Sequence, residues 1–126
     1  MTHDTLTQAN SFCDIVRDHA LATPDTPAFT FGDNVTSFAQ LDEAGNRAAR
    51  VLTDLGVSKG ERVCFLGKNH PFYFEVLLGA ARIGAVMTPV NWRLAPPEVA
   101  YILGTAQARV AFVGEGFIEM LETARA

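Results

Sequence analysis

The chain has 126 residues, of which 48% are hydrophobic and 19% charged, and its formal net charge is −4 at pH 7. This length is typical of one domain and permits a substantial core. The acidic balance and the absence of a run of Lys or Arg argue against a nucleic-acid partner. The longest apolar stretch, from about residue 76 to 90, is interrupted by Arg82, Gly84 and Pro89. It is therefore too short and too broken to span a bilayer.

The N-terminal residues and the cysteines predict a cellular compartment. Residues 1–4 lack the basic start and the apolar core of a signal peptide. Cys13 and Cys64 have no CxxC spacing and are expected to be reduced thiols. We therefore expect a cytoplasmic protein.

The first 36 residues predict a helix followed by a hairpin. From about Asn10 to Ala22, apolar residues recur at helical spacing, and the proline-rich residues 23–27 then end the helix. Two short β-prone runs, Ala28 to Phe31 and Val35 to Thr36, flank the turn residues 32–34. That pattern is typical of a β-hairpin.

A long helix is predicted next. Ser37 and Gln40 have the spacing of a capping box, and Gly56 supplies the left-handed residue that ends the helix. One apolar face is expected, made of Leu41, Ala44, Ala48, Val51, Leu52 and Leu55. The carboxylates Asp42, Glu43 and Asp54 are expected on the outer, solvated side.

The second half of the chain alternates apolar strands with helices. Strands are predicted at Arg62 to Leu66, Ala85 to Val90 and Arg109 to Val113. Between them, Pro71, capped by Asn69 or His70, and Pro96 mark the starts of helices, and a last helix is predicted over 117–125. This alternation predicts an α/β fold in which a hairpin precedes a three-stranded parallel sheet with right-handed crossovers and flanking helices.

Common catalytic and binding motifs are not fulfilled. Residues 60–69 lack the glycine spacing of a P-loop, and Asn69 stands where Ser or Thr would hold magnesium. In the segment Gly114-Glu115-Gly116, the third glycine position of a dinucleotide fingerprint holds Glu119. The histidines and cysteines share no metal-ligand spacing. We therefore predict no catalytic residue and no metal site within residues 1–126.

Several segments together resemble one enzyme family over residues 11 to 113. They are HALATPDTPAF, SFAQLDEAGNRAARVLTDLGVSKGERV, GKNHPFYFEVLLGAARIGAVMTPVNWRLAPPEVAYIL and the strand ARVAFV. In order and spacing they are similar to the N-terminal part of AMP-forming acyl-CoA synthetases and ligases, the adenylate-forming enzymes. The tetrad Asn91-Trp92-Arg93-Leu94 most resembles ligases of fatty-acyl and aryl acids.

The resemblance implies a chemistry that this segment does not complete. Family members activate a carboxylic acid with ATP and magnesium to an acyl-adenylate, and most then transfer the acyl group to CoA. Their phosphate-binding loop with Lys, and the Lys of the C-terminal domain, have no counterpart in this sequence. Residues 1–126 are thus expected to be the N-terminal part of the large AMP-binding domain, with the C-terminal domain absent. Alone, the segment is expected to be inactive and to hold no cofactor. Its expected partner is the remainder of the parent enzyme or a second, self-associated copy.

Two residues of the tetrad are candidate binding residues. The resemblance implies that Arg93 lies near a phosphate of CoA, while the alternative is an Arg whose side chain bonds backbone carbonyls to fix the turn. Trp92 is a candidate for an acyl or pantetheine channel, and the alternative is a packing anchor. Asn91 is expected to satisfy backbone groups in the turn. Ala95 stands where relatives often have a capping Ser or Thr, so a looser turn is expected.

Two other functions stay open at this point. One is a non-catalytic interaction module derived from the same fold. The other is a stand-alone flavodoxin-like domain that binds a nucleotide or flavin, for which a bound flavin in purified protein would be the sign.

Overall fold

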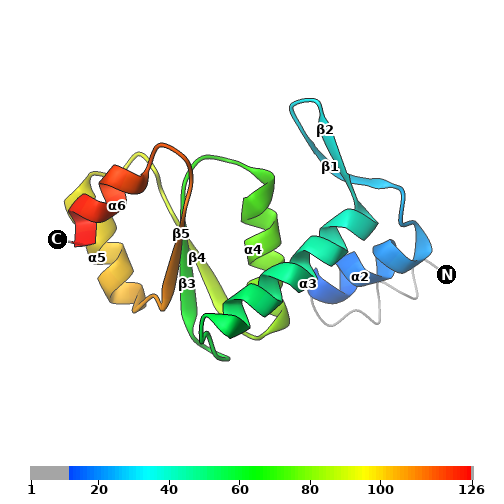
Figure 1. Ribbon diagram of the computed structural model, residues 1–126, viewed down its shortest axis with the longest axis horizontal. Helices are drawn as coiled ribbons and strands as arrows, with labels where there is room; N and C mark the ends of the chain where they lie inside the picture. Colours follow the sequence, from blue (N-terminus) through cyan, green and yellow to red (C-terminus); the bar gives the residue numbers. More distant parts are fainter. Residues whose placement is uncertain (1–11, 126) are drawn as a thin grey trace.

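The computed structural model describes residues 12 to 125 and contains an antiparallel strand pair and a three-stranded parallel sheet (Figure 1). Its elements are α2 (Phe12–Ala22), β1 (Pro27–Phe31), β2 (Asn34–Ser37), α3 (Phe38–Asp54), β3 (Arg62–Leu66), α4 (Pro71–Arg82), β4 (Val86–Val90), α5 (Pro96–Ala106), β5 (Val110–Val113) and α6 (Ile118–Arg125). The predicted α/β class, hairpin and parallel sheet are confirmed. The predicted helix start at Asn10 lies outside the described residues. Within them, no helix has the length and apolar character needed to cross a membrane.

The central strand of the parallel sheet is β3. It pairs with β4 on one side and with β5 on the other, and Cys64 lies opposite Thr88 and Ala111 in the register. Helices α3 and α4 lie on one face of the sheet, and α5 and α6 lie on the other (Figure 1). Among the described strands, β4 and β5 are the edges. β4 contains Pro89, a residue that sheets accept at an edge because it lacks a backbone N–H.

Both faces of β3 are buried. Its side chains alternate, so Val63 and Phe65 contribute to the core below α3 and α4, whereas Cys64 and Leu66 contribute to the core below α5 and α6. These four side chains are at most 4% exposed. Burial on both faces explains why this strand reads as a continuous apolar run.

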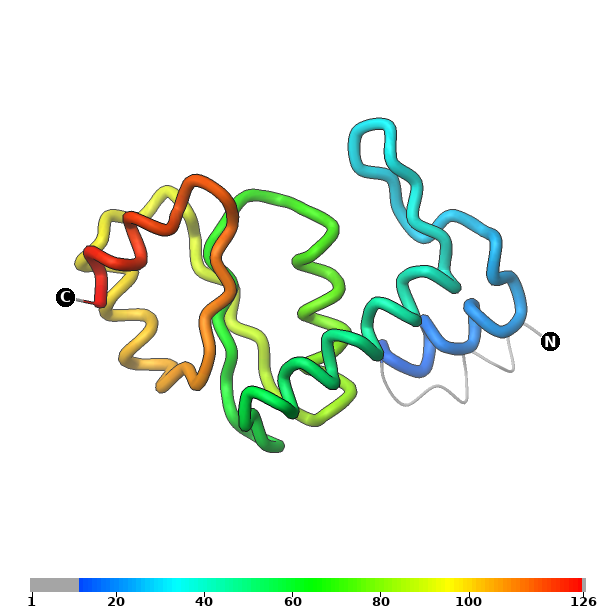
Figure 2. Tube along the Cα trace, viewed as in Figure 1, coloured from blue at the N-terminus to red at the C-terminus, as the bar shows by residue number. Residues whose placement is uncertain are grey.

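The hairpin and α2 form a smaller part beside the sheet (Figure 2). Cys13 and Val16 of α2 are buried there together with Leu41 of α3 and Leu78 of α4, and Phe29 of β1 packs against them. The β1–β2 hairpin extends away from α3. Because α3 and α4 contribute to this core and to the core of the sheet, these two helices join the two parts.

The predicted helix starts are largely confirmed. Ser37 and Gln40 make both bonds of the capping box, with the Ser37 side chain accepting from the Gln40 amide at 3.2 Å. At α4 the cap is His70 rather than Asn69, since the Nδ1 of His70 accepts from the Phe72 amide at 3.1 Å. Each bond satisfies a backbone donor that the first helical turn leaves without an intrahelical partner.

Two predictions about α3 were wrong. Val51 and Leu55 are 49% and 50% exposed, because α4 covers the helix along a neighbouring stripe that includes Leu41, Gly45 and Leu52. Asp42 is not simply solvated either. Its carboxylate pairs with Arg82 of α4, whose guanidinium also donates to the Asp42 carbonyl at 2.7 Å and to Asn46 at 2.8 Å. A long-range partner of this kind leaves no local sequence signal.

Helices α3 and α4 approach each other closely at two glycines, which have no side chain to hold the helices apart. A Cβ atom built on Gly79 would lie 2.6 Å from the Ala48 Cβ and 2.8 Å from the Ala49 backbone nitrogen. On α3, a Cβ on Gly45 would lie 2.4 Å from Leu78 Cδ2. Only a residue without a side chain permits this contact, so Gly79 sets the distance between the helices.

We predict that Gly79→Ala destabilises the protein and that Gly104→Ala does not. A methyl group added at position 79 would meet fixed backbone and force the helices apart, at a cost of about 1–3 kcal/mol. At Gly104, in α5, an added Cβ meets nothing within 4 Å, so the better helix propensity should stabilise by up to about 1 kcal/mol. Urea unfolding of both variants measures the difference. A Gly79→Ala protein as stable as the wild type would contradict the close contact.

Candidate functional site

The carboxyl ends of all three parallel strands contribute to one group of side chains. Lys68 follows β3, Trp92 and Arg93 follow β4, and Phe117 follows β5. Lys68, Arg93 and Phe117 each contact the indole ring of Trp92. We call these four residues the strand-end cluster. In open parallel sheets this edge is the usual place for a ligand.

Trp92 fixes the centre of the strand-end cluster. It is partly buried against the core below α5 and α6, and its ring centre lies 5.8 Å from that of Phe117. This contact fits the expected packing anchor. The part of Trp92 that stays exposed lines a hollow, and its role in an acyl or pantetheine channel remains a prediction.

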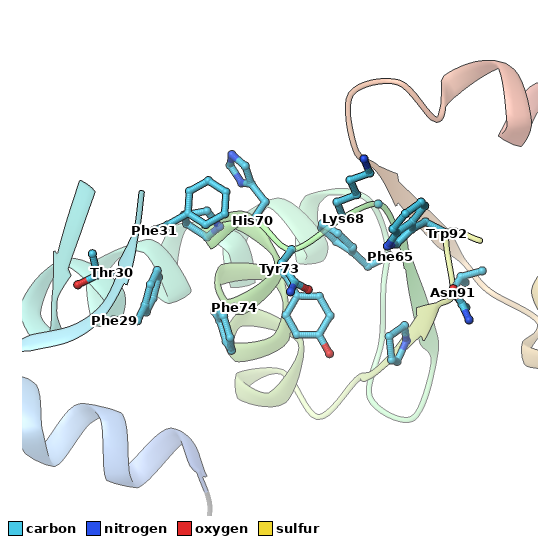
Figure 3. A pocket seen from close by; sticks show the side chains of 15 residues that line it. Phe29, Thr30, Phe31, Phe65, Lys68, His70, Tyr73, Phe74, Asn91 and Trp92 are labelled. Atoms are coloured by element: carbon cyan, nitrogen blue, oxygen red, sulfur yellow. The ribbon is translucent and has the colours of Figure 1, made fainter. Parts of the chain in front are cut away.

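Two cations lie against the same indole ring. The Nζ atom of Lys68 is 4.8 Å from the centre of the Trp92 ring, and the Cζ atom of Arg93 is 4.5 Å from it. Figure 3 shows Lys68 beside Trp92 at the rim of the hollow. The ring quadrupole attracts a cation to its face, which holds these two exposed side chains in place.

The turn after β4 is stabilised by Asn91 and Glu98. The Asn91 side-chain oxygen accepts from the Arg93 amide at 2.9 Å, and the Asn91 carbonyl accepts from the Leu94 amide at 3.1 Å. Ala95 provides no side-chain cap, as expected, but its amide donates to the Glu98 carboxylate at 2.9 Å and keeps the turn ordered. Within residues 12–125, no recorded bond joins the Arg93 guanidinium to a backbone carbonyl. The role of the Arg93 side chain therefore stays a prediction.

A hollow of about 680 Å³ lies between the hairpin and the strand-end cluster (Figure 3). Its wall is largely apolar and aromatic, with Lys68 and Asn91 as polar groups on one side. The residues that line it are Phe29, Thr30, Phe31, Phe65, Gly67, Lys68, Asn69, His70, Pro71, Tyr73, Phe74, Pro89, Val90, Asn91 and Trp92. A second hollow of about 520 Å³ lies on the β5 side of Lys68 and includes Glu115. A largely apolar concavity with a few polar groups is typical of a small-molecule site.

The aromatic residues at the start of α4 join the hairpin to the sheet. Tyr73 packs against the core, while Phe72 and Phe74 are 40% and 44% exposed. The Phe74 ring lies 5.2 Å from Phe29 of the hairpin, and the Phe72 ring lies 5.6 Å from Phe112 of β5. These contacts join the hairpin to the sheet, and Tyr73 and Phe74 also form part of the wall of the first hollow.

Sequence reasoning missed Lys68 and Phe117. Lys68 was considered only within a rejected P-loop, and Phe117 only as the start of the last helix. The available signal was position, because each residue comes shortly after an apolar parallel strand. Parallel strands bring such positions to the same edge, whatever their separation in the sequence.

The thiol of Cys64, in the central strand, has a shifted pKa. Cys64 is fully buried in β3, and this burial raises the pKa of its thiol above the ordinary value, because the thiolate would lose its hydration. Its role is therefore structural packing rather than nucleophilic chemistry. In the part of the chain that the structure describes, no three or more His, Cys, Asp or Glu residues are grouped to hold a metal ion.

Comparison with known proteins gives a consistent result. The model of the family described as AMP-binding enzyme matches residues 16–126. A fatty acid–[acyl-carrier-protein] ligase of Streptomyces coeruleorubidus is 39% identical over 118 residues, which are 94% of this chain and 22% of that protein. A long-chain-fatty-acid–CoA ligase of Mycobacterium tuberculosis is 36% identical over 114 residues, which are 89% of this chain and 23% of that protein. This chain thus spans less than a quarter of the length of these relatives.

Solved structures agree with these matches. The inhibitor-bound N-terminal domain of FACL13 from Mycobacterium tuberculosis has a TM-score of 0.84 and 36% identity, and the match covers 88% of this chain and 28% of that one. The anthranilate CoA ligase AuaEII in complex with anthranoyl-AMP has a TM-score of 0.86 and 29% identity, over 90% of this chain and 22% of that one. These matches do not favour the flavodoxin-like domain or the interaction module that the sequence left open.

We predict that the buried thiol makes stability depend on pH in the alkaline range. The pKa of Cys64 is raised in the folded state. The unfolded chain therefore loses its thiol proton first, near the pKa of an ordinary Cys thiol, about 8.5. The free energy of unfolding should therefore be insensitive to this group below about pH 8. Above about pH 8.5 it should fall by at most about 1.4 kcal/mol per pH unit.

The matched control is Cys64→Ala, measured by urea unfolding from pH 7 to 10. Other groups also titrate in this range. The contribution of Cys64 is therefore the difference between the wild type and the variant in the slope of unfolding free energy against pH. Equal slopes for the wild type and the variant would contradict this prediction.

Proposed function

Because this chain belongs to the family of AMP-binding enzymes, we propose that it forms the N-terminal part of an AMP-forming ligase that activates a carboxylic acid with ATP. The observation that carries the proposal is the match of residues 16–126 to that family. The relatives named above act on fatty acids, and a further one, 36% identical over 107 residues, is an indoleacetate–CoA ligase from Aromatoleum aromaticum. We therefore propose a fatty or aryl acid as the substrate class.

The proposed reaction overcomes the low reactivity of a carboxylate. Attack of the acid on the α-phosphate of ATP releases pyrophosphate and gives an acyl-adenylate, from which a thiol displaces AMP. When bound, Mg²⁺ supplies positive charge that offsets the charge on the phosphates. Residues 12–125 offer apolar walls and two cations at the strand ends.

The thiol acceptor is proposed to be CoA, with Arg93 at one of its phosphates and Trp92 along the channel of the pantetheine arm. The exposed position of Arg93 and its contact with Trp92, which lines the first hollow, support this role. A carrier-protein thiol is the second candidate, because the relative with 39% identity is named as an acyl-carrier-protein ligase. Both acceptors carry a phosphopantetheine arm.

The partner proposed for this segment is the rest of such an enzyme in the cytoplasm, or a second copy where that rest is missing. Exposed apolar side chains support the proposal, since Val51 beside β5 and Val86 on edge strand β4 are 49% and 51% exposed. Apolar surface beside an open strand is usually covered in a folded protein.

We predict that the 126-residue chain alone does not adenylate an acid. Its sequence contains no phosphate loop with Lys, so the charge of ATP would stay uncompensated. ATP–pyrophosphate exchange with a panel of fatty and aryl acids measures this. The protein encoded by the complete reading frame should give acid-dependent exchange. If that longer protein exchanges with no acid of the panel, the ligase proposal is wrong.

We predict that Arg93→Ala in the ligase weakens the use of CoA and spares adenylation. Loss of a charged contact with phosphate should raise the KM for CoA by roughly tenfold to a hundredfold. Arg93→Lys should recover part of the effect, because the charge remains while the bidentate geometry is lost. Exchange and thioester formation are measured separately.

Arg50→Ala, at an exposed position of α3, controls for the loss of one positive charge. A purely structural Arg93 would instead lower the melting temperature and both half-reactions together. An unchanged KM for CoA in a well-folded Arg93→Ala protein would rule out the phosphate contact.

A further inference from the structure

Lys68 is a cation to which the proposed reaction assigns no role. It is exposed, it follows the central strand β3, and its ammonium group lies 4.8 Å from the centre of the Trp92 ring. Arg93 reaches the same ring from the end of β4. The ends of β3 and β4, which α4 separates in the sequence, therefore each place one positive charge beside the Trp92 ring.

The loop that carries Lys68 is held by close backbone packing. The Gly114 amide donates to the Leu66 carbonyl at 2.7 Å, which ties the end of β5 to the end of β3. A Cβ on Gly67 would lie 3.1 Å from the Gly114 Cα, so the two glycines bring the loops nearer than side chains would allow. The backbone beside Lys68 is thus fixed relative to the sheet, and only its side chain remains adjustable.

The two charges lie close to each other, and one carboxylate, that of Glu115, lines the second hollow together with Lys68. Because both are near one ring centre, their separation cannot exceed the sum of the two distances to it. This upper limit on the separation is comparable with the screening length of about 8 Å at physiological salt, so the fields of the two cations add. Of the ion pairs recorded within residues 12–125, none includes Lys68 or Arg93. The Glu98 carboxylate is already bonded to the Ala95 amide.

Such an arrangement favours a ligand with more than one phosphate. Two like charges held near each other repel, and an anion that spans both relieves that repulsion. A single phosphodiester can neutralise one cation well but reaches the second only weakly. The first hollow beside Lys68 leaves room for such a ligand, whereas the second contains the Glu115 carboxylate, which would repel a phosphate.

We propose that Lys68 and Arg93, both beside Trp92, form a two-cation site for the nucleotide end of CoA that selects CoA over a carrier-bound phosphopantetheine. This inference rests on the proposed function, since it concerns the thiol acceptor of the same ligase. CoA carries a pyrophosphate and a 3′-phosphate on its nucleotide. A phosphopantetheine arm on a carrier protein carries one phosphodiester. Lys68 is therefore a residue that determines acceptor specificity.

The chain carries its own probe for this site, because Trp92 is its only tryptophan. A ligand that draws Lys68 and Arg93 away from the indole changes the environment of that ring. The sequence led us to expect that the segment alone holds no cofactor, but all four residues of the strand-end cluster lie within it. We therefore expect CoA to shift or quench the fluorescence of the 126-residue chain in a saturable way. Dephospho-CoA, which lacks the 3′-phosphate, should bind less tightly, and pantetheine should give no saturable change at the same concentrations.

The variants separate a binding role from a packing role. Lys68→Ala should weaken CoA binding by roughly tenfold and reduce the preference for CoA over dephospho-CoA, while Lys68→Arg should restore most of both. Lys59→Ala, at an exposed position before β3, removes the same charge away from the strand ends and should bind as the wild type does. If the Lys68–Trp92 contact only packs, Lys68→Ala lowers the melting temperature and leaves the CoA preference unchanged, which overturns the proposal. So does the absence of any CoA-dependent signal.

The same variants in the longer ligase distinguish the acceptor inference from the proposed function. Lys68→Ala should raise the KM for CoA roughly tenfold more than the KM for a holo carrier protein. Lys59→Ala should leave both KM values and ATP–pyrophosphate exchange unchanged. If the wild-type ligase gives no exchange, the proposed function fails, whatever the fluorescence titration shows. If exchange is normal and Lys68→Ala alters neither the CoA titration nor the KM for CoA, the acceptor inference alone fails.

Discussion

The burial of β3 on both faces is the constraint on which the rest of the structure depends. A strand covered by helices on both sides needs parallel neighbours and long crossovers, which place α4 and α5 on opposite faces of the sheet. The close contact of α3 with α4, set by Gly79, then ties the hairpin and α2 to the sheet. In this way one strand of five residues fixes the arrangement of the described chain.

The position of the strand-end cluster follows from the same topology. Because the three strands run in one direction, the residues that follow them lie at the same edge of the sheet. There Lys68 and Phe117 contact the indole ring of Trp92. Dispersion and ring electrostatics hold the aromatic partners, and the cation contacts hold Lys68 and Arg93.

The sequence predicted what local patterns encode. The capping box at Ser37, the hairpin and the apolar strands all have signals within a few residues of one another, and all are confirmed. What it missed depends on partners distant in the chain. Asp42 looked solvated because Arg82 lies 40 residues away, and Lys68 looked ordinary because its contact with Trp92 arises only when β3 and β4 pair. Functional roles at such positions require the fold.

Pro89 limits the edge at which a further strand can pair with the parallel sheet. The register keeps β4 paired with β3 through this residue, and the ring nitrogen has no hydrogen to offer a strand on the outer side. The opposite border, β5, contains no proline and can bond along its whole length. Any further strand is therefore expected to add beyond β5, on the side where Phe112 and Val51 offer apolar contact. Pro89 thus makes the two edge strands differ in their capacity to donate backbone hydrogen bonds.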